Sequence, residues 1–158
     1  MIDGYNVCVF AYGQTGSGKT YTLQGNKENP GIIARSIGEI FNLIEPLKPH
    51  STINLNIHMV EIYMDNLIDL LSSKENKNTH LEIKEDYKGM TYIQNVTIIK
   101  ILNKEDFEKN VKIGMNNRKT GKTDMNDESS RSHLILTVVI EIINKDKNYV
   151  IKLISMSF

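Results

Sequence analysis

The sequence is short of the residues that mark several classes of protein. Its 158 residues include no tryptophan, three prolines and one cysteine, and nineteen basic side chains balance nineteen acidic ones. The single cysteine, Cys8, excludes an internal disulfide and fits a reducing compartment, and its place in an apolar run predicts a small core residue. No run reaches the roughly 20 apolar residues of a membrane-spanning helix. Because the net charge is zero, we expect no nucleic-acid or membrane partner, and a cytosolic or cytoskeletal location.

A glycine-rich loop that ends in lysine and threonine is the strongest signal in the chain. Such a pattern arises by chance roughly once in two hundred chains of this length. Glycines allow the backbone amides to wrap closely around phosphates, the lysine places its charge near the β- and γ-phosphates, and the Thr20 hydroxyl is placed to bind Mg²⁺. The predicted binding residues for a nucleotide such as ATP are Gly13, Gln14, Thr15, Gly16, Ser17, Gly18, Lys19 and Thr20.

The residues on either side of this loop predict a strand and then a helix. Residues 7–11 (VCVFA) are expected to form a buried parallel strand, and the helix should begin near Lys19 and run to about Leu23. The free amides and the positive dipole end of that helix would face the same phosphates. A glycine-rich surface turn is the alternative interpretation, and the setting between a strand and a helix argues against it.

Two longer helices are predicted from apolar residues at helical spacing. The first covers about 31–44, and the prolines at 46 and 49 would end it. The second begins at a cap on Asn103 and runs to about Met115. A short helix over 65–71, capped by Asp65, is also expected.

Strand patterns fill most of the remaining chain. Strands are expected at 52–63 with a bulge near Val60, at 81–84 paired with 90–96, at 134–143 and at 149–154. His58 lies in the first of these with no second ligand at useful spacing, which favours a structural histidine over a metal ligand. Strands mixed with helices predict an α/β fold.

A second polar cluster lies far from the glycine-rich loop in the sequence. Residues 126–133 read NDESSRSH and directly precede an apolar strand. The serines alone could form a capping loop, but beside a phosphate loop the cluster indicates a switch segment for the γ-phosphate. GQTGSGKT followed by NDESSRSH resembles the signature of the kinesin motor domain. The resemblance covers nearly the whole chain, and KGMTYIQNVT and SSRSHLILTVVIE look most like the C-terminal-motor class, especially its calmodulin-binding kinesin-like subgroup.

The resemblance implies roles for individual residues. Ser130 would help Thr20 to organise Mg²⁺, Ser129 would lie near the γ-phosphate and the attacking water, and Tyr21 would stack near the adenine. The loop at 86–89 would lie on the microtubule side. The implied catalytic residues are Lys19, Asn126, Ser129, Ser130 and Arg131.

The chain departs from the kinesin pattern at both ends. In kinesins the strand corresponding to 149–154 leads into a DLAGSE segment, the second switch, whose glutamate would pair with Arg131, and Ser157 stands where its aspartate is expected. The N-terminal strands of the adenine pocket are also missing. We therefore expect residues 1–158 to be a partial motor domain, from the phosphate loop through the first switch and the following hairpin, truncated at both ends. Since loss of one electrostatic group commonly costs about 2.7–4 kcal/mol of transition-state stabilisation, loss of the second switch should cost more.

By this resemblance the fold would be a P-loop NTPase with a mixed central sheet flanked by helices. The function would be that of a microtubule-dependent ATPase, which couples ATP hydrolysis to movement along microtubules as part of a full-length kinesin. Homo-oligomers would form through regions outside this chain. The alternative is a nucleotide-binding but non-hydrolysing module that docks on tubulin or on another motor subunit. A P-loop kinase for a small metabolite is a third hypothesis, against which NDESSRSH argues.

Overall fold

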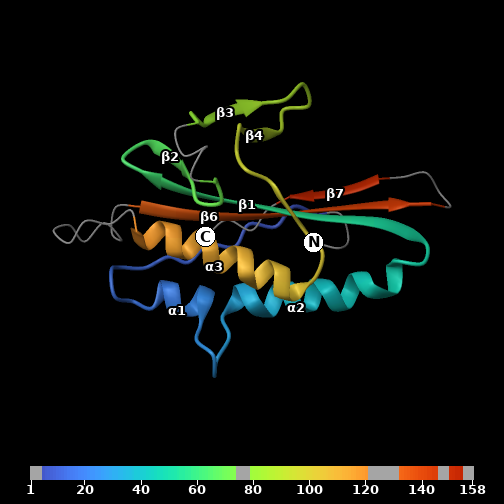
Figure 1. Cartoon of the computed structure of the whole chain (residues 1–158), viewed down its shortest axis with the longest axis horizontal. Helices are drawn as coiled ribbons and strands as arrows, with labels where there is room; N and C mark the ends of the chain where they lie inside the picture. The colour runs from blue at the N-terminus through green and yellow to red at the C-terminus, as the bar shows by residue number, and fades with distance from the viewer. Residues whose placement is uncertain (1–4, 74–78, 121–131, 146–149, 155–158) are drawn as a thin grey trace.

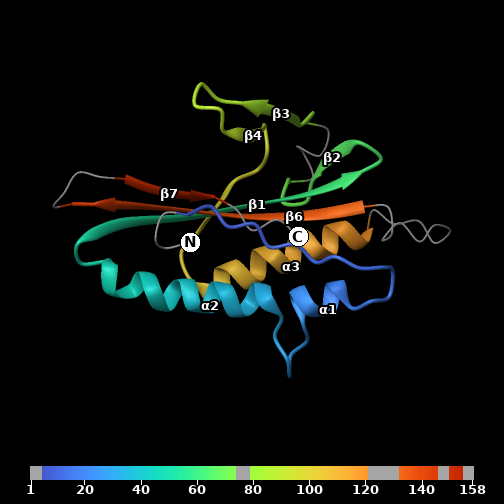
Figure 2. The same ribbon diagram turned by 180° about the vertical axis from the view of Figure 1, so that it is seen from behind.

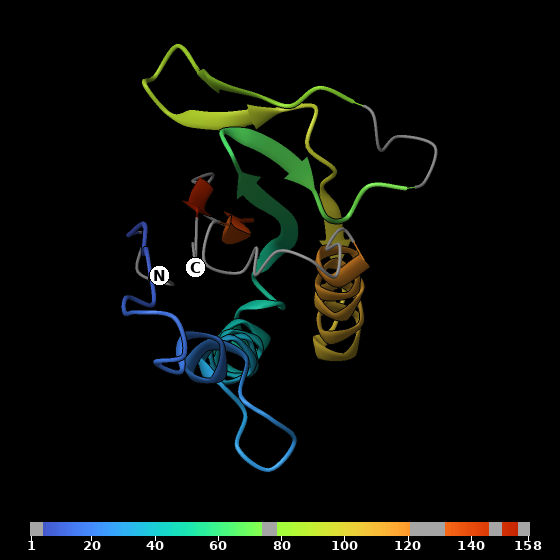
Figure 3. The same cartoon turned by 90° about the vertical axis from the view of Figure 1, so that its left-hand side faces the viewer.

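The computed structural model describes residues 5–73, 79–120, 132–145 and 150–154. Its helices lie on one side of a β-sheet, and a separate β-hairpin lies on the opposite side (Figures 1 and 3). The view from behind shows the same layers (Figure 2). The predicted α/β class is confirmed. Among the described helices, none combines the length and apolarity that a bilayer crossing requires.

Two long antiparallel strands form the centre of the sheet. They are β1 (Ser51–Tyr63) and β6 (Ser132–Asn144), which pair along their full lengths. On the far side of β6 lies β7 (Val150–Ile154), and the other edge of β1 pairs with β2 (Asn66–Asp69) and β5 (Ile99–Ile101). The strands at 52–63, 134–143 and 149–154 are thus confirmed, and β5 was not predicted. Every pairing among the described strands of this sheet is antiparallel.

The helices begin and end close to their predicted positions. α1 (Lys19–Gln24) follows the glycine-rich loop, and α2 (Ile32–Ile44) runs on into the single 3₁₀ turn η1 (Glu45–Leu47). α3 (Lys104–Thr120) ends five residues beyond the predicted Met115. The Asn103 side chain caps it by accepting a hydrogen bond of 2.8 Å from the Asp106 amide, and the Asp106 carboxylate accepts one of 3.2 Å from the Leu102 amide. This reciprocal pair satisfies two amides that would otherwise lack a partner at the helix start.

The core lies between the helices and one face of β1 and β6. The alternation of these strands turns every second residue toward the helices, and α2 and α3 present their apolar faces in return. Full burial of each such side chain stabilises the fold by about 1.5–3 kcal/mol. The buried residues include Ile33, Ile37, Ile40 and Ile44 of α2, Leu55, Ile57 and Met59 of β1, Phe107 of α3, and Leu136, Val138 and Ile140 of β6.

The hairpin on the other side of the sheet was predicted correctly. Its strands are β3 (Glu82–Glu85) and β4 (Thr91–Gln94), paired antiparallel. In the connecting turn the Asp86 carboxylate accepts hydrogen bonds from the amides of Lys88 at 2.8 Å and Met90 at 2.9 Å. Such side-chain bonds hold the turn closed without neighbouring structure.

The strand predicted at 7–11 is wrong. These residues form no regular element, Cys8 is exposed, and Phe10 is 73% exposed. Only Ala11 of this run packs against the core. A buried parallel strand requires hydrogen-bonded neighbours, and no described strand pairs with this segment. The prediction that Cys8 lies in the core is wrong for the same reason.

The short helix predicted over 65–71 is also wrong. Met64 and Asp65 adopt left-handed φ angles of 46° and 62°, and the chain turns back as β2, with Tyr63 opposite Asn66. Two consecutive left-handed residues make the tight turn whose twist matches paired strands. Because four apolar residues fit either a short helix or a short strand, their spacing alone could not distinguish the two.

The bulge predicted near Val60 is absent as well. The pairing of β1 with β6 runs without interruption from Ser51 to Tyr63. Met59 and Val60 are both fully buried, so the strand is covered on both faces at this point. A strand covered on both faces carries apolar residues at consecutive positions. The sequence therefore shows the same break in alternation that a bulge would produce.

Candidate functional site

The glycine-rich loop between residues 12 and 19 folds into a compact turn. Gly16 and Gly18 have φ angles of 83° and 91°, which residues with a Cβ rarely adopt. A Cβ on Gly13 would collide with the Ser17 hydroxyl. The Ser17 amide donates to the Gln14 carbonyl at 3.2 Å, which closes the turn. The glycines are therefore required by the backbone path, as expected for a loop that surrounds phosphates.

Lys19 bends back over this loop. Its ammonium donates hydrogen bonds of 2.8 Å to the carbonyl oxygens of both Gly13 and Gln14. The charge of the lysine is thus held at the loop by neutral acceptors, and a phosphate oxygen would be a stronger acceptor for the same ammonium. Of the residues predicted to bind phosphate, the structure brings Lys19 and the loop together.

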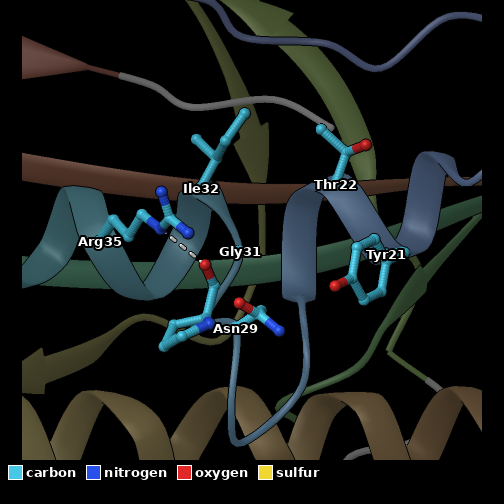
Figure 4. A pocket seen from close by; sticks show the side chains of 7 residues that line it. Tyr21, Thr22, Asn29, Gly31, Ile32 and Arg35 are labelled. Atoms are coloured by element: carbon cyan, nitrogen blue, oxygen red, sulfur yellow. Dashed lines mark hydrogen bonds between the residues drawn. The ribbon is translucent and has the colours of Figure 1, made fainter.

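Thr20 and Tyr21 follow in the first turn of α1. Both are exposed, so a hydroxyl and an aromatic ring are available to a ligand beside the loop. Tyr21, 56% exposed, also borders a hollow of about 340 Å³ between α1, the following loop and α2 (Figure 4). On the α2 side, the Arg35 Nε atom donates to the Pro30 carbonyl at 2.7 Å, which holds the guanidinium at the wall of the hollow. No residue of the glycine-rich loop lines this hollow, and Tyr21, in the helix that follows the loop, is the lining residue nearest to the loop in the sequence.

The implied switch residues lie outside the described part of the chain. They are Asn126, Ser129, Ser130 and Arg131. The described residues on both sides of them are the end of α3 and the start of β6, and these are joined by one side chain. The Arg118 Nε atom donates to Glu61 Oε1 at 2.8 Å, and its Nη2 atom donates to the Ser132 hydroxyl at 3.0 Å.

Sequence reasoning missed this ion pair, although a signal was present. Phe107, Val111 and Met115 mark the buried face of α3, and Arg118 lies three residues further along the same face. A buried arginine requires a carboxylate partner, and Glu61 is the charged residue among the buried side chains of β1.

The other predicted features stand as follows. The turn at 86–89 lies at one end of the β3–β4 hairpin, on the side of the sheet away from the helices (Figure 1). His58 lies half-buried on that same face of β1, and burial lowers its pKa while the charge of Asp69 opposes the shift. Within the described residues, no group of three or more histidine, cysteine or acidic side chains could hold a metal ion. A Mg²⁺ ion at this site would instead rely on the Thr20 hydroxyl and on oxygens of the ligand's phosphates.

Comparison with known proteins identifies the family of the chain. The kinesin motor domain family model matches residues 1–157. The chain is 49% identical over 143 residues to the kinesin-like protein KIN-14E of Arabidopsis thaliana, which covers 90% of this chain and 11% of that protein. It is 48% identical to the kinesin-like protein KIN-14I of Oryza sativa subsp. japonica over 90% of this chain and 12% of that protein. The chain therefore spans about a ninth of the length of these curated relatives.

Solved structures give the same result. A structure of the C-terminal motor and motor homology domain of Kar3Vik1, fused to a synthetic heterodimeric coiled coil, has a TM-score of 0.82 at 37% identity. The match covers 98% of this chain and 38% of that one. The structure of a fast kinesin has a TM-score of 0.86 at 31% identity, and the match covers 99% of this chain and 46% of the kinesin chain. The family model, the relatives and the solved structures agree with one another, and the chain belongs to the kinesin motor domain family.

Proposed function

We propose that this chain binds ATP through residues 13–20 and forms the nucleotide-binding part of a motor that couples ATP hydrolysis to movement along microtubules. The observation that carries the proposal is the Lys19 ammonium held against a loop with two left-handed glycines. A cradle of this kind suits the phosphates of a nucleotide, which supply oxygens in place of the loop carbonyls. Membership of the kinesin motor domain family supports the same assignment.

The nucleotide would be held by residues of the loop and of α1. Loop amides and Lys19 would bind the phosphates, Thr20 would bind Mg²⁺ together with phosphate oxygens, and Tyr21 would contact the base. When bound, Mg²⁺ would neutralise charge on the phosphates. Asn126, Ser129, Ser130 and Arg131 remain the proposed catalytic residues of the first switch, with Ser130 as a second Mg²⁺ ligand. The proposed domain spans residues 1–158.

Tubulin would be the macromolecular partner, and the location would be the cytoplasmic microtubule cytoskeleton. The turn at 86–89 is the proposed contact, since it lies on the side of the sheet opposite the helices. Tyr87 is 91% exposed there, and the Lys88 ammonium lies 5.4 Å from the centre of its ring. The exposed ring of Tyr87 and the Lys88 ammonium would supply an aromatic and a cationic contact to tubulin, while the Asp86 carboxylate is engaged by amides within the turn. Any homo-oligomer would form through regions outside this chain.

A lysine substitution tests the phosphate loop. Lys19→Ala removes the charge directed at the phosphates, and hydrogen bonds to charged groups contribute about 1.5–3 kcal/mol. We expect ATP affinity to fall by ten- to a hundredfold or more in a titration with a fluorescent ATP analogue. Lys27→Ala, an exposed lysine in the loop between α1 and α2, is the matched control and should leave the affinity unchanged. Equal affinity in Lys19→Ala and in the unaltered chain would refute the assignment.

Turnover separates the motor from the alternative module. We expect ATP hydrolysis to rise when microtubules are added. Intact ATP binding without microtubule-stimulated turnover would favour a non-hydrolysing module that docks on tubulin or on another motor subunit.

A further inference from the structure

Much of the apolar surface of the β3–β4 hairpin stays exposed. Among the described strands, β3 and β4 pair with each other and with no strand of the larger sheet. Ile83 and Tyr92 border the space between the hairpin and the sheet, yet they remain 61% and 46% exposed. Because hydrophobic stabilisation grows with the apolar area removed from water, packing alone holds the hairpin weakly. Its place over the sheet (Figure 3) therefore depends on its connections to the rest of the chain.

One carboxylate fixes the connection that leaves the hairpin. Asp69, the last residue of β2, accepts a hydrogen bond of 2.7 Å at Oδ2 from the Thr97 amide, which lies in the segment between β4 and β5. A hydrogen bond to a carboxylate at this distance is charge-assisted and about twice as strong as one between neutral groups. The Asn95 side chain donates to the His80 carbonyl at 3.1 Å, which joins the two connections of the hairpin at its base. The Asp69 carboxylate therefore anchors the base of the hairpin to β2.

Asp69 is itself held firmly in place. Its Oδ1 atom accepts a hydrogen bond of 2.9 Å from the Leu71 amide, and its carbonyl accepts one of 3.1 Å from the Ser72 hydroxyl. The Leu70 amide donates to the Met59 carbonyl of β1 at 2.9 Å. Leu70, Leu71 and Ser72 are all buried. Because both the backbone and the second carboxylate oxygen are held, the side chain sets the position of its partner amide relative to the core.

We propose that Asp69 is a positioning residue for the tubulin contact at residues 86–89. Through the Thr97 amide it holds the hairpin, and with it the turn that carries Tyr87 and Lys88, in one place relative to the sheet. Asp69 does not touch tubulin in this role. The proposal rests on the proposed function, which assigns the microtubule contact to that turn. If only a fraction of the molecules hold the turn in its binding position, the apparent affinity falls by that fraction.

An asparagine substitution separates the two hydrogen bonds of this carboxylate. Asp69→Asn keeps an oxygen for the local bond to the Leu71 amide, but its NH₂ group cannot accept a hydrogen bond from the Thr97 amide. We expect the affinity of the whole chain for microtubules, measured by co-sedimentation with a non-hydrolysable ATP analogue, to fall at least about fivefold. Exchange of the Thr97 amide hydrogen, measured by NMR, should become about tenfold faster or more. Asp65→Asn, an exposed carboxylate in the turn between β1 and β2, is the matched control and should change neither quantity.

A second substitution tests whether Asp69 acts through the turn. Lys88→Ala removes one proposed contact, and its effect should be smaller in the Asp69→Asn chain, because a displaced turn no longer presents Lys88 to tubulin. Additive losses would show that Asp69 affects binding by another route and would overturn the proposal. Binding is measured at pH 7.5. Burial lowers the pKa of His58 below 6.5 while the charge of Asp69 opposes the shift, so this histidine is neutral with aspartate or asparagine at position 69.

The outcomes separate this proposal from the one on which it rests. If the unaltered chain does not bind microtubules, the proposed partner is wrong, and this inference fails with it. If the unaltered chain binds and Asp69→Asn binds equally well, the positioning role alone is overturned. Unchanged exchange of the Thr97 amide would also overturn it, since the anchor would then be absent in solution. An equal loss of affinity for microtubules and for the ATP analogue would overturn it as well, because that pattern indicates a general loss of structure, which thermal unfolding of the variant detects directly.

Discussion

His58 lies half-buried on the face of β1 that turns away from the helices. Burial lowers its pKa below the ordinary value of 6.5, and the nearby charge of Asp69 acts in the opposite direction. The unfolded chain therefore binds a proton more readily than the folded chain does. The contribution of His58 to stability is complete above its unfolded pKa and is lost as the pH falls below about 6.5.

This shift predicts a pH-dependent stability with a known sign. Between pH 7.5 and pH 5.5 the midpoint of thermal unfolding of the unaltered chain should fall. The midpoint of the His58→Asn variant should fall less over the same range. Because other groups titrate in both chains, the difference between the two curves is the quantity to compare. A drop of the same size in His58→Asn would show that burial of this imidazole does not couple folding to protonation.

At the scale of secondary-structure elements, Gly114 sets the distance between α3 and β1. A Cβ at this position would collide with the Met59 sulfur and crowd a methyl group of Leu71. Met59 is fully buried and Leu71 is buried, so a shift of either side chain would disturb neighbours in the core. The glycine is therefore a packing requirement, although glycine lowers helix propensity.

Two glycine-to-alanine substitutions test this close approach. In an open helix position alanine is more favourable than glycine by about 0.8–1.0 kcal/mol, whereas overpacking a core costs about 1–3 kcal/mol. Gly114→Ala should therefore lower the free energy of unfolding by up to about 2 kcal/mol. Gly38→Ala, in the middle of α2 with nothing near its Cβ position, should raise it by about 1 kcal/mol. Urea unfolding measures both, and a gain of stability in both variants would show that α3 and β1 are less closely packed than described.

Elements with dense apolar periodicity were predictable, and those defined by their neighbours were not. In α2 apolar residues recur at helical spacing, and in β6 they alternate with others. Each pattern places many apolar residues on one face and so predicts which face is buried. Residues 7–11 have a strand-like composition, but a strand is formed by pairing, which composition does not encode. The turn at Met64 and Asp65 could not be predicted from the sequence, because methionine rarely adopts a left-handed conformation.

The candidate site also has a part that the sequence predicts and a part that depends on tertiary contacts. The glycine-rich loop is a local pattern within eight consecutive residues, so the need for glycine in its backbone was predictable, while its binding of phosphate stays a prediction. The contact of Arg118 with Glu61 joins residues 57 positions apart, and it depends on how α3 packs against β1. Single-sequence periodicity could place Arg118 on the buried face, but it could not name the partner.

For the molecule as a whole, the two faces of the sheet differ in how fully they are covered. The helices lie against one face, whereas the β3–β4 hairpin stands over the other (Figure 3). A groove of about 480 Å³ lies between the hairpin and the sheet. Val138 and Val139 are neighbours in β6 that point to opposite faces. Val138 is 2% exposed among the core residues, and Val139 is partly exposed and lines the groove.

This asymmetry predicts unequal effects from one substitution at adjacent positions. Val138→Ala leaves a cavity in a filled core and should lower the free energy of unfolding by about 2 kcal/mol, whereas Val139→Ala borders existing space and should cost less than about 1 kcal/mol. Both variants lose the same two methyl groups from the same strand, so β-propensity cancels in the comparison. Denaturant unfolding at low protein concentration measures the difference. Equal losses would mean that the groove face is as tightly covered in solution as the helix face, which would contradict the difference between the two faces described here.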